Sequence, residues 1–207
     1  MQWNLYDVLV ILAAYLIGNI SPAIILGKLS GVDIKKEGSG NAGTTNVLRV
    51  LGKKAAFITL VIDIAKGFLA VRLGMLFGYE TGAVCAVAVF CGHIWPCFYR
   101  FKGGKGVATA FGALLAINWM LGLTALAIVA AGLFISKRMS VGSILGAITF
   151  PLVCYYLEPE FLYEGSLMAL IILIKHRANI GRLLRREEPP MGIFKSKEED
   201  KSAHNEI

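Results

Sequence analysis

The chain has 207 residues, of which 56% are hydrophobic and only 17% are charged, and its formal net charge at pH 7 is +7. A soluble domain carries about 25% charged residues, so this composition and the mean hydropathy of +0.64 argue against a water-soluble protein and indicate that lipid is its solvent. The charge is also unevenly placed, because residues 1–186 hold 18 basic and eight acidic residues, a net charge of +10.

The hydrophobic residues fall into seven runs, and several approach the ~20 residues that cross ~30 Å of hydrocarbon. The first run lacks the basic start and the cleavage site of a signal peptide, so we expect a retained membrane helix that kinks near Gly18 and Pro22. The fourth run is too short to cross and predicts a half-helix or a re-entrant segment. The runs cover residues 5–29, 55–77, 81–98, 107–117, 119–135, 141–157 and 161–174.

Lysine and arginine gather at alternate ends of these runs, in 28–54, 100–105, 137–138 and 175–186. The positive-inside rule assigns these ends to the cytoplasm. The fold class predicted is therefore an all-α polytopic membrane protein of about seven transmembrane helices in the cell inner (cytoplasmic) membrane, with its N-terminus outside and its C-terminus cytoplasmic. A basic cytoplasmic face also attracts anionic lipids and substrates.

Two regions divide the chain. Residues 1–186 are expected to form the membrane-embedded domain. Residues 187–207 combine Pro189-Pro190 with a run of Lys, Glu and Asp, which is typical of a disordered tail. We expect this tail to be cytoplasmic and dispensable for activity.

A first polar loop spans residues 38–49, where three glycines alternate with small hydrogen-bonding residues. A helix is expected to begin near Thr44, with Thr44, Thr45 or Asn46 as its cap and Arg49 about one turn further on. The free N–H groups of a helix N-terminus bind anions. An ordinary glycine-rich turn between helices is the alternative.

A second polar loop is Lys102-Gly103-Gly104-Lys105-Gly106. Glycine lets backbone N–H groups approach an anion closely, and lysine adds positive charge, so this loop resembles a phosphate cradle. Neither loop carries the GxxxxGK[ST] pattern of a Walker A motif. His93 precedes the loop, where a buried structural histidine and a site residue are equally good interpretations.

Other polar residues lie within or next to the runs. Asp63 and Lys66 are three residues apart inside an apolar run, which favours a structural ion pair because a charge at membrane depth needs a partner. Ser140 is a natural N-cap whose hydroxyl could also face a phosphate. His176, Asn179 and Arg182 recur every third residue along one helix face, as a phosphate-binding stripe or a solvated basic end.

The four cysteines show no pattern that binds a metal. Cys85, Cys91, Cys97 and Cys154 form no CxxC pair and have no zinc-like spacing with histidine. We expect small buried hydrophobic residues, with no disulfide and no metal site.

Four motifs together are similar to a known family. GSGNAGTTNVLR (38–49), DIAKG (63–67), GHIWPCFYRFKGGKGVATAFG (92–112) and KHRANIGRLL (175–184) resemble, in this order, the bacterial acyl-phosphate-dependent glycerol-3-phosphate acyltransferases. These are small integral membrane enzymes of phospholipid biosynthesis. The resemblance covers nearly the whole chain to about Leu184.

The resemblance implies a seven-helix fold with a cytoplasmic active site. The acyl donor would be a long-chain acyl phosphate, and the acceptor would be the 1-hydroxyl of sn-glycerol 3-phosphate. The products would be lysophosphatidic acid and inorganic phosphate. Acyl phosphate, glycerol 3-phosphate and membrane lipid are the implied partners, with no cofactor and no nucleic acid; acyl-chain preference and oligomeric state stay open.

The resemblance also implies site residues. The catalytic positions would be His176, Asn41 and Ser39. Cations and N–H donors would hold two anions together against their repulsion, and amide groups would stabilise the developing oxyanion. The phosphate groups would be bound by Ser39, Thr45, Asn46, Arg49, Lys102, Lys105, Ser140 and Asn179.

The base that deprotonates the acceptor is less directly indicated. Neither His93 nor His176 has a carboxylate five residues later, since those positions are Phe98 and Gly181. We favour a phosphate of one substrate as the base, with His176 as the alternative.

A transporter of phosphorylated solutes is the main rival function, but the chain shows no internal repeat and its polar groups gather on one side. A scaffold without catalysis is a third interpretation.

Overall fold

The computed structural model describes residues 3–194, and every regular element in that range is helical. The helices are α1 (Leu5–Gly18), α2 (Pro22–Leu29), α3 (Thr44–Met75), α4 (Tyr79–Ile94), α5 (Val107–Ile117), α6 (Trp119–Ser136), α7 (Met139–Leu157), α8 (Leu162–Lys175) and α9 (Arg177–Leu184). Short 3₁₀ turns lie at η1 (Cys97–Tyr99), η2 (Pro159–Phe161) and η3 (Gly192–Phe194).

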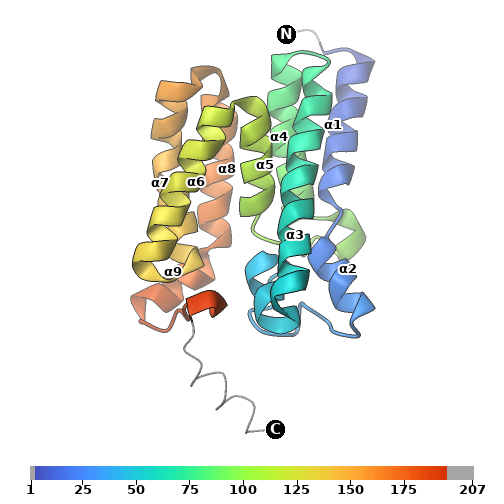
Figure 1. Ribbon diagram of the computed structural model, residues 1–207. Helices are drawn as coiled ribbons and strands as arrows, with labels where there is room; N and C mark the ends of the chain where they lie inside the picture. The colour runs from blue at the N-terminus through green and yellow to red at the C-terminus, as the bar shows by residue number, and fades with distance from the viewer. Residues whose placement is uncertain (1–2, 195–207) are drawn as a thin grey trace, which may run out of the picture.

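The long helices stand side by side in a bundle (Figure 1). Helices α1, α3, α4 and α5 form one group and α6, α7 and α8 another, while α2 and α9 lie at the end near the C-terminus. The links rich in Lys and Arg meet at this same end, which agrees with the alternation of charge along the sequence. We call it the basic end.

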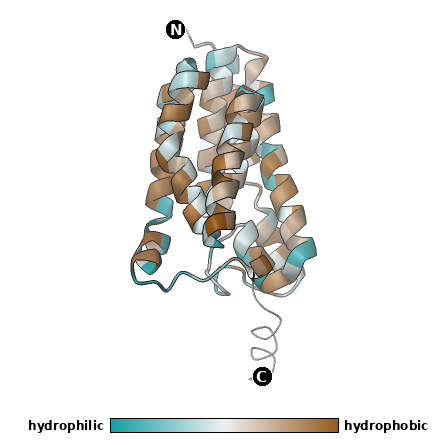
Figure 2. Cartoon of the chain, turned by 60° about the vertical axis from the view of Figure 1, so that its left-hand side comes forward, coloured by the Kyte–Doolittle hydropathy of each residue, from teal (hydrophilic) through white to brown (hydrophobic). Residues whose placement is uncertain are grey.

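The outer surface of the bundle is apolar, as a lipid-facing surface must be. Figure 2 shows hydrophobic residues along the helices and hydrophilic ones gathered mainly toward the two ends. By length and composition, four segments in residues 3–194 are able to cross a membrane: Leu5–Leu29, Tyr79–Tyr99, Trp119–Ser136 and Met139–Leu157. The chain is therefore a multi-pass membrane protein.

The first hydrophobic run breaks into two helices, a larger change than the expected kink. The break covers Asn19 to Ser21, and hydrogen bonds of the Asn19 side chain and of the Ile20 carbonyl oxygen hold it in place. The Asn19 side chain donates to the Tyr15 carbonyl oxygen at 2.7 Å and accepts from the Cys97 N–H at 2.5 Å. Lys66 Nζ donates to the Ile20 carbonyl oxygen at 2.6 Å.

Helix α3 is divided near its start. Gly52 has φ 82° and ψ −175°, a left-handed backbone that favours glycine. The residues before it therefore form a separate short helical piece at the basic end, seen in cyan in Figure 1. This break lets the first polar loop fold under the bundle.

Helix α5 spans only part of the bundle. Its 11 residues rise about 16 Å, roughly half of the hydrocarbon thickness, and Figure 1 shows α5 beginning part-way along α3. The structure thus favours the half-helix interpretation of this run. The second polar loop, which leads into α5, is consequently recessed within the bundle.

Residues 187–194 form a C-terminal strap against the body. The Met191 N–H donates to the Lys137 carbonyl oxygen at 2.8 Å, and the Phe194 ring meets the Phe134 ring edge-on with centroids 6.1 Å apart. The sequence predicted a disordered tail from residue 187, whereas residues 187–194 make these contacts. The rest of the predicted tail, 195–207, lies outside the described residues.

Candidate active site

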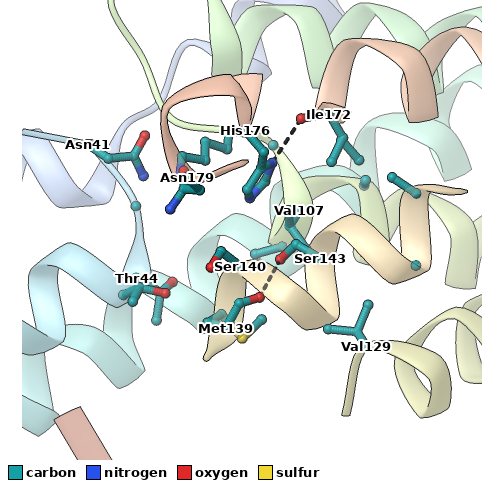
Figure 3. A pocket seen from close by; sticks show the side chains of 18 of the residues that line it. Asn41, Thr44, Val107, Val129, Met139, Ser140, Ser143, Ile172, His176 and Asn179 are labelled. Atoms are coloured by element: carbon teal, nitrogen blue, oxygen red, sulfur yellow. Dashed lines mark hydrogen bonds between the residues drawn. The ribbon is translucent and has the colours of Figure 1, made fainter. Parts of the chain in front are cut away.

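A cavity of about 610 Å³ joins the polar loops to the helix interior. Its polar wall lies at the basic end, and its apolar wall is made by side chains of α3, α5, α6, α7 and α8. Figure 3 shows polar side chains from distant parts of the chain around one space, among them Thr44, Ser140 and Asn179. The polar wall includes Ser39, Asn41, Thr44, Thr45, Arg49, Lys105, Ser140, His176, Asn179, Arg182 and Glu188.

The N-terminus of α3 opens into this cavity. Its N-cap is Gly43, which offers no side-chain hydrogen bond, so none of the three expected caps forms. The buried Thr44 hydroxyl has no partner, and Thr44 lies across the cavity from Ser140 and Asn179 (Figure 3). A helix N-terminus without a cap leaves N–H groups free for an anion.

Asn46 holds the first loop in shape. Its side-chain nitrogen donates to the carbonyl oxygens of Ile34 at 3.1 Å and Glu37 at 3.0 Å, and its oxygen accepts from the Ser39 N–H at 2.7 Å. All of its hydrogen-bonding capacity except one lone pair is thus committed to the loop. Asn46 therefore supports Ser39 rather than offering its own amide group to a ligand.

The two lysines of the second loop have different positions. Lys105 lines the cavity, and its Nζ donates to the Asn179 side-chain oxygen. Burial lowers the pKa of Lys105 to about 8, against the attraction of Glu188 and with help from the positive charges of Arg182 and Arg49. Lys102 is exposed and does not line the cavity.

His176 terminates α8 inside the cavity. Its Nδ1 donates to the Ile172 carbonyl oxygen at 2.8 Å, so the lone pair of neutral His176 lies on Nε2 (Figure 3). Burial, followed by the positive charge of Lys105, lowers the pKa of His176 to about 4. The ring is therefore neutral at pH 7 and is a weak base.

Ser140 does not cap α7, because Arg138 occupies that position and Ser140 is the second helical residue. Instead, its hydroxyl donates to Glu188 Oε1 at 2.7 Å. Ser140 thus faces the cavity instead of capping the helix, which agrees with the second of the two interpretations of the sequence.

Glu188 is a site residue that the sequence did not reveal. Its carboxylate accepts hydrogen bonds from Ser140, from Asn179 Nδ2 at 2.6 Å and from Arg182 Nε at 2.7 Å. Burial raises the pKa of Glu188, but these three hydrogen bonds outweigh it and the pKa lies below its usual value. The position of Glu188 at the start of a charged tail did not indicate a role in the site. The stripe of His176, Asn179 and Arg182 did indicate the surface that Glu188 contacts.

Asp63 and Lys66 form the expected ion pair, with Lys66 Nζ 2.7 Å from Asp63 Oδ1. His93 joins them, since its Nδ1 lies 2.8 Å from Lys66 Nζ and 3.2 Å from Asp63 Oδ1. All three residues are buried between helices α3 and α4. We call this group the ionic triad.

The chain was compared with known proteins. The family model for glycerol-3-phosphate acyltransferase matches residues 8–186. This chain belongs to that family. The glycerol-3-phosphate acyltransferase of Thermoanaerobacter pseudethanolicus is 44% identical over 192 residues, covering 91% of this chain and 97% of the relative. That of an Enterobacter species is 42% identical over 182 residues, covering 86% of this chain and 89% of the relative.

Two solved structures support membership of the glycerol-3-phosphate acyltransferase family. The glycerol 3-phosphate form of PlsY (YgiH), an integral membrane glycerol 3-phosphate acyltransferase, has a TM-score of 0.87 and 32% identity, covering 92% of this chain and 100% of that one. Its lysophosphatidic acid form has a TM-score of 0.81 and 33% identity, covering 90% and 96%. The protein is therefore an integral membrane acyltransferase of phospholipid biosynthesis.

The family match includes every site residue predicted from the sequence and stops two residues before Glu188. The resemblance of the four motifs is thus confirmed at the level of the family. Membership does not assign individual residues to substrates, so their roles belong to the proposal that follows.

Proposed function

We propose that this acyltransferase moves a long-chain acyl group from acyl phosphate to the 1-hydroxyl of sn-glycerol 3-phosphate, releasing lysophosphatidic acid and inorganic phosphate. The observation that carries this proposal is a single cavity with anion-binding groups at one end and an apolar wall at the other. Glycerol 3-phosphate and lysophosphatidic acid forms of the similar PlsY structures support the same acceptor and product here.

The polar wall suits two phosphate-bearing substrates. Arg49, Lys105 and Arg182 supply cations from three separate elements, and the uncapped start of α3 supplies N–H donors. Such groups hold two anions within reacting distance and reduce the cost of their repulsion. Ser39 and Asn41 line the same space, and in this proposal they donate or accept hydrogen bonds at the reacting carbonyl.

The apolar wall suits a fatty acyl chain. It continues from the polar mouth along α7 from Ser143 to Phe150, and Met168 and Ala169 of α8 add to it. Burial of each methylene of such a chain stabilises the complex by about 0.8 kcal/mol. Long-chain donors therefore fit the cavity better than short-chain donors.

A substrate phosphate is the base in our proposal. The pKa of His176 is about 4, whereas the second pKa of a phosphate monoester is about 6. The phosphate dianion is thus the stronger base at pH 7 and lies beside the hydroxyl that loses its proton. His176 then orients substrate through its Nε2 lone pair.

We also propose that α1, α3, α4, α6, α7 and α8 cross the cytoplasmic membrane, and that the half-length α5 completes a seventh crossing together with the loop that leads into it. In this arrangement the N-terminus lies outside and the site faces the cytoplasm. The gathering of basic links at the end that holds the cavity mouth supports this orientation. Glu158 and Glu160 lie in the α7–α8 link, and Glu164 in the first turn of α8, at the opposite end.

The decisive experiment supplies the purified protein in detergent with palmitoyl phosphate or palmitoyl-CoA as the donor, and with glycerol 3-phosphate or glycerol as the acceptor. We expect phosphate release and lysophosphatidic acid only with palmitoyl phosphate and glycerol 3-phosphate together. Equal turnover with palmitoyl-CoA would contradict the proposed donor, and turnover with glycerol would contradict the role of the acceptor's phosphate.

A further inference from the structure

We propose that the ionic triad of Asp63, Lys66 and His93 positions the second polar loop so that Lys105 enters the cavity. These three residues are positioning residues in this proposal, because they act on the reaction through the loop. The inference rests on the proposed function in requiring that Lys105 binds a substrate phosphate. It assigns a functional task to a buried group that would otherwise be only an ion pair.

The triad combines hydrogen bonds with an ion pair. Lys66 Nζ donates to the Ile20 carbonyl oxygen at 2.6 Å and contacts His93 Nδ1 at 2.8 Å, and it forms an ion pair with Asp63 Oδ1 at 2.7 Å. A lysine ammonium carries donors only and cannot accept a hydrogen bond. His93 Nδ1 consequently accepts a hydrogen bond, and the ring proton lies on Nε2.

His93 contacts the second polar loop through both its backbone and its ring. Its carbonyl oxygen accepts from the Gly104 N–H at 3.2 Å, and the neighbouring Ile94 carbonyl oxygen accepts from the Gly103 N–H at 3.1 Å. A Cβ on Gly103 would overlap the His93 carbonyl oxygen, and a Cβ on Gly104 would overlap His93 Nε2. The loop therefore packs directly against His93 at Gly103 and Gly104, and Gly104 immediately precedes Lys105.

The first polar loop meets the second at the same place. A Cβ on Gly104 would also come within 2.8 Å of the Ala42 carbonyl oxygen, so Gly104 lies between the His93 ring and the first loop. Lys66 in turn binds Ile20 in the break between α1 and α2. The triad thus links the α1–α2 break, α3 and the end of α4 to the point where both loops touch.

The position of the triad favours this task over a purely structural one. Asp63 and His93 line the cavity, and their side chains are 2% and 5% exposed. A rigid support is what a loop that carries a substrate-binding cation requires, because small errors in the position of that cation reduce the rate strongly. The triad thus borders the cavity and supports the second polar loop through the contacts of His93 with Gly103 and Gly104.

A double-mutant cycle between Lys66→Met and Lys105→Ala tests the proposal. We expect Lys66→Met to lower kcat/KM about 100-fold, as a misplaced catalytic group does. If Lys66 acts through Lys105, the double variant should lose no more than roughly twofold beyond Lys105→Ala alone. Losses that multiply would show that the two residues act independently and would overturn the proposal.

Asp63→Asn provides a second, isosteric variant, with Asp7→Asn as its matched control. Asp7 is a buried carboxylate at the opposite end of the bundle, where it accepts from the Thr81 hydroxyl at 2.9 Å. We expect Asp63→Asn to lower kcat/KM about 10-fold and Asp7→Asn to change it by less than about twofold. Wild-type kinetics for Asp63→Asn would overturn the proposal.

Folding and function are separated by two further measurements. Thermal unfolding in detergent identifies a variant that fails to fold, and failure of both triad variants would show that the triad holds the fold rather than the loop. Calorimetric titration with glycerol 3-phosphate should show weaker binding in Asp63→Asn than in Asp7→Asn. This difference tests the triad even if palmitoyl phosphate proves to be the wrong donor.

Discussion

Lys105 and Lys102 lie three residues apart in one loop and give a matched comparison at the scale of single residues. Only Lys105 lines the cavity, so Lys105→Ala should lower kcat/KM by about 100-fold or more, as loss of a preorganised charge donor does. Lys102→Ala should change it by less than about twofold, as expected of an exposed side chain. Phosphate release measures both, and equal losses would show that the loop binds substrate with either lysine.

The pKa of Lys105 predicts a pH dependence. Because this pKa is lowered from 10.5 to about 8, Lys105 loses its positive charge as the pH rises through 8. We therefore expect kcat/KM for glycerol 3-phosphate to fall above pH 8, since this parameter follows ionisation of the free enzyme. Lys105→Arg should remove this alkaline decline, and an unchanged profile in that variant would assign the decline to another group.

His176→Gln distinguishes the two candidate bases. Glutamine keeps a polar side chain but cannot act as a base, so an obligatory His176 base predicts no turnover at any pH. A substrate phosphate as the base predicts reduced turnover whose pH profile resembles that of the wild type. We expect the second result because the lowered pKa of His176 makes it a weak base.

Individual site residues were predictable from the sequence where residue type and position agreed. Lys105, His176 and Asn179 came from motifs, and the cavity brings them together. Asn46 and Lys102 have the same residue chemistry as Asn179 and Lys105, and only the direction of each side chain sets them apart. Glu188 could not be predicted, because its role depends on the strap folding back onto Ser140 and Arg182.

The C-terminal strap is the element whose role differs most from expectation. A chain ending at Phe194 keeps Glu188, and we expect it to match the full chain in stability and activity. A chain ending at Arg186 loses the carboxylate that binds Ser140, Asn179 and Arg182. Losing about 2 kcal/mol of charge-assisted hydrogen bonding should lower Tm by roughly 5 °C.

Two substitutions check this result without truncation. Glu188→Gln should reproduce much of the loss, whereas Glu187→Gln, at an exposed pair with Arg185, should not. Since the folded-state pKa of Glu188 lies below its ordinary value of 4.5, its contribution is complete above pH 4.5 and is lost as the pH falls through the folded value. Equal Tm values for the two variants at pH 7 would contradict the role of Glu188.

At the scale of elements, hydropathy located the helices but not their interruptions. The runs predicted all of the long helices because apolar length is a strong signal. The break at Asn19–Ser21 depends on two residues distant in sequence: the Cys97 N–H donates to the Asn19 side-chain oxygen, and Lys66 Nζ donates to the Ile20 carbonyl oxygen. The short helix α9 has a polar composition and was predicted from its stripe of His176, Asn179 and Arg182.

At the scale of the whole molecule, we expect the depth of the apolar side of the cavity to set the acyl-chain preference. Ala147 of α7 is a buried wall residue on the apolar side of the cavity. Ala147→Phe should reduce the depth available and shift the preference toward shorter acyl phosphates. The KM for glycerol 3-phosphate should stay within about twofold, because the polar wall is untouched.

A series of donors with increasing chain length measures this shift. The chain-length profile of Ala147→Phe is compared with that of Ala125→Phe, a variant of α6 at a less buried position of the same cavity. An unaltered chain-length profile in Ala147→Phe, with the variant still folded, would show that the acyl chain lies elsewhere.

The half-length of α5 has a consequence for the environment in which the reaction takes place. Because the helix begins part-way through the bundle, the loop that follows α4 lies at a depth where the proposed acyl phosphate would already reside. That donor would then have no need to leave its leaflet. Turnover should then follow the mole fraction of donor in the surrounding lipid or micelle rather than its bulk concentration. Diluting the donor with inert detergent at constant total amount should slow the enzyme accordingly.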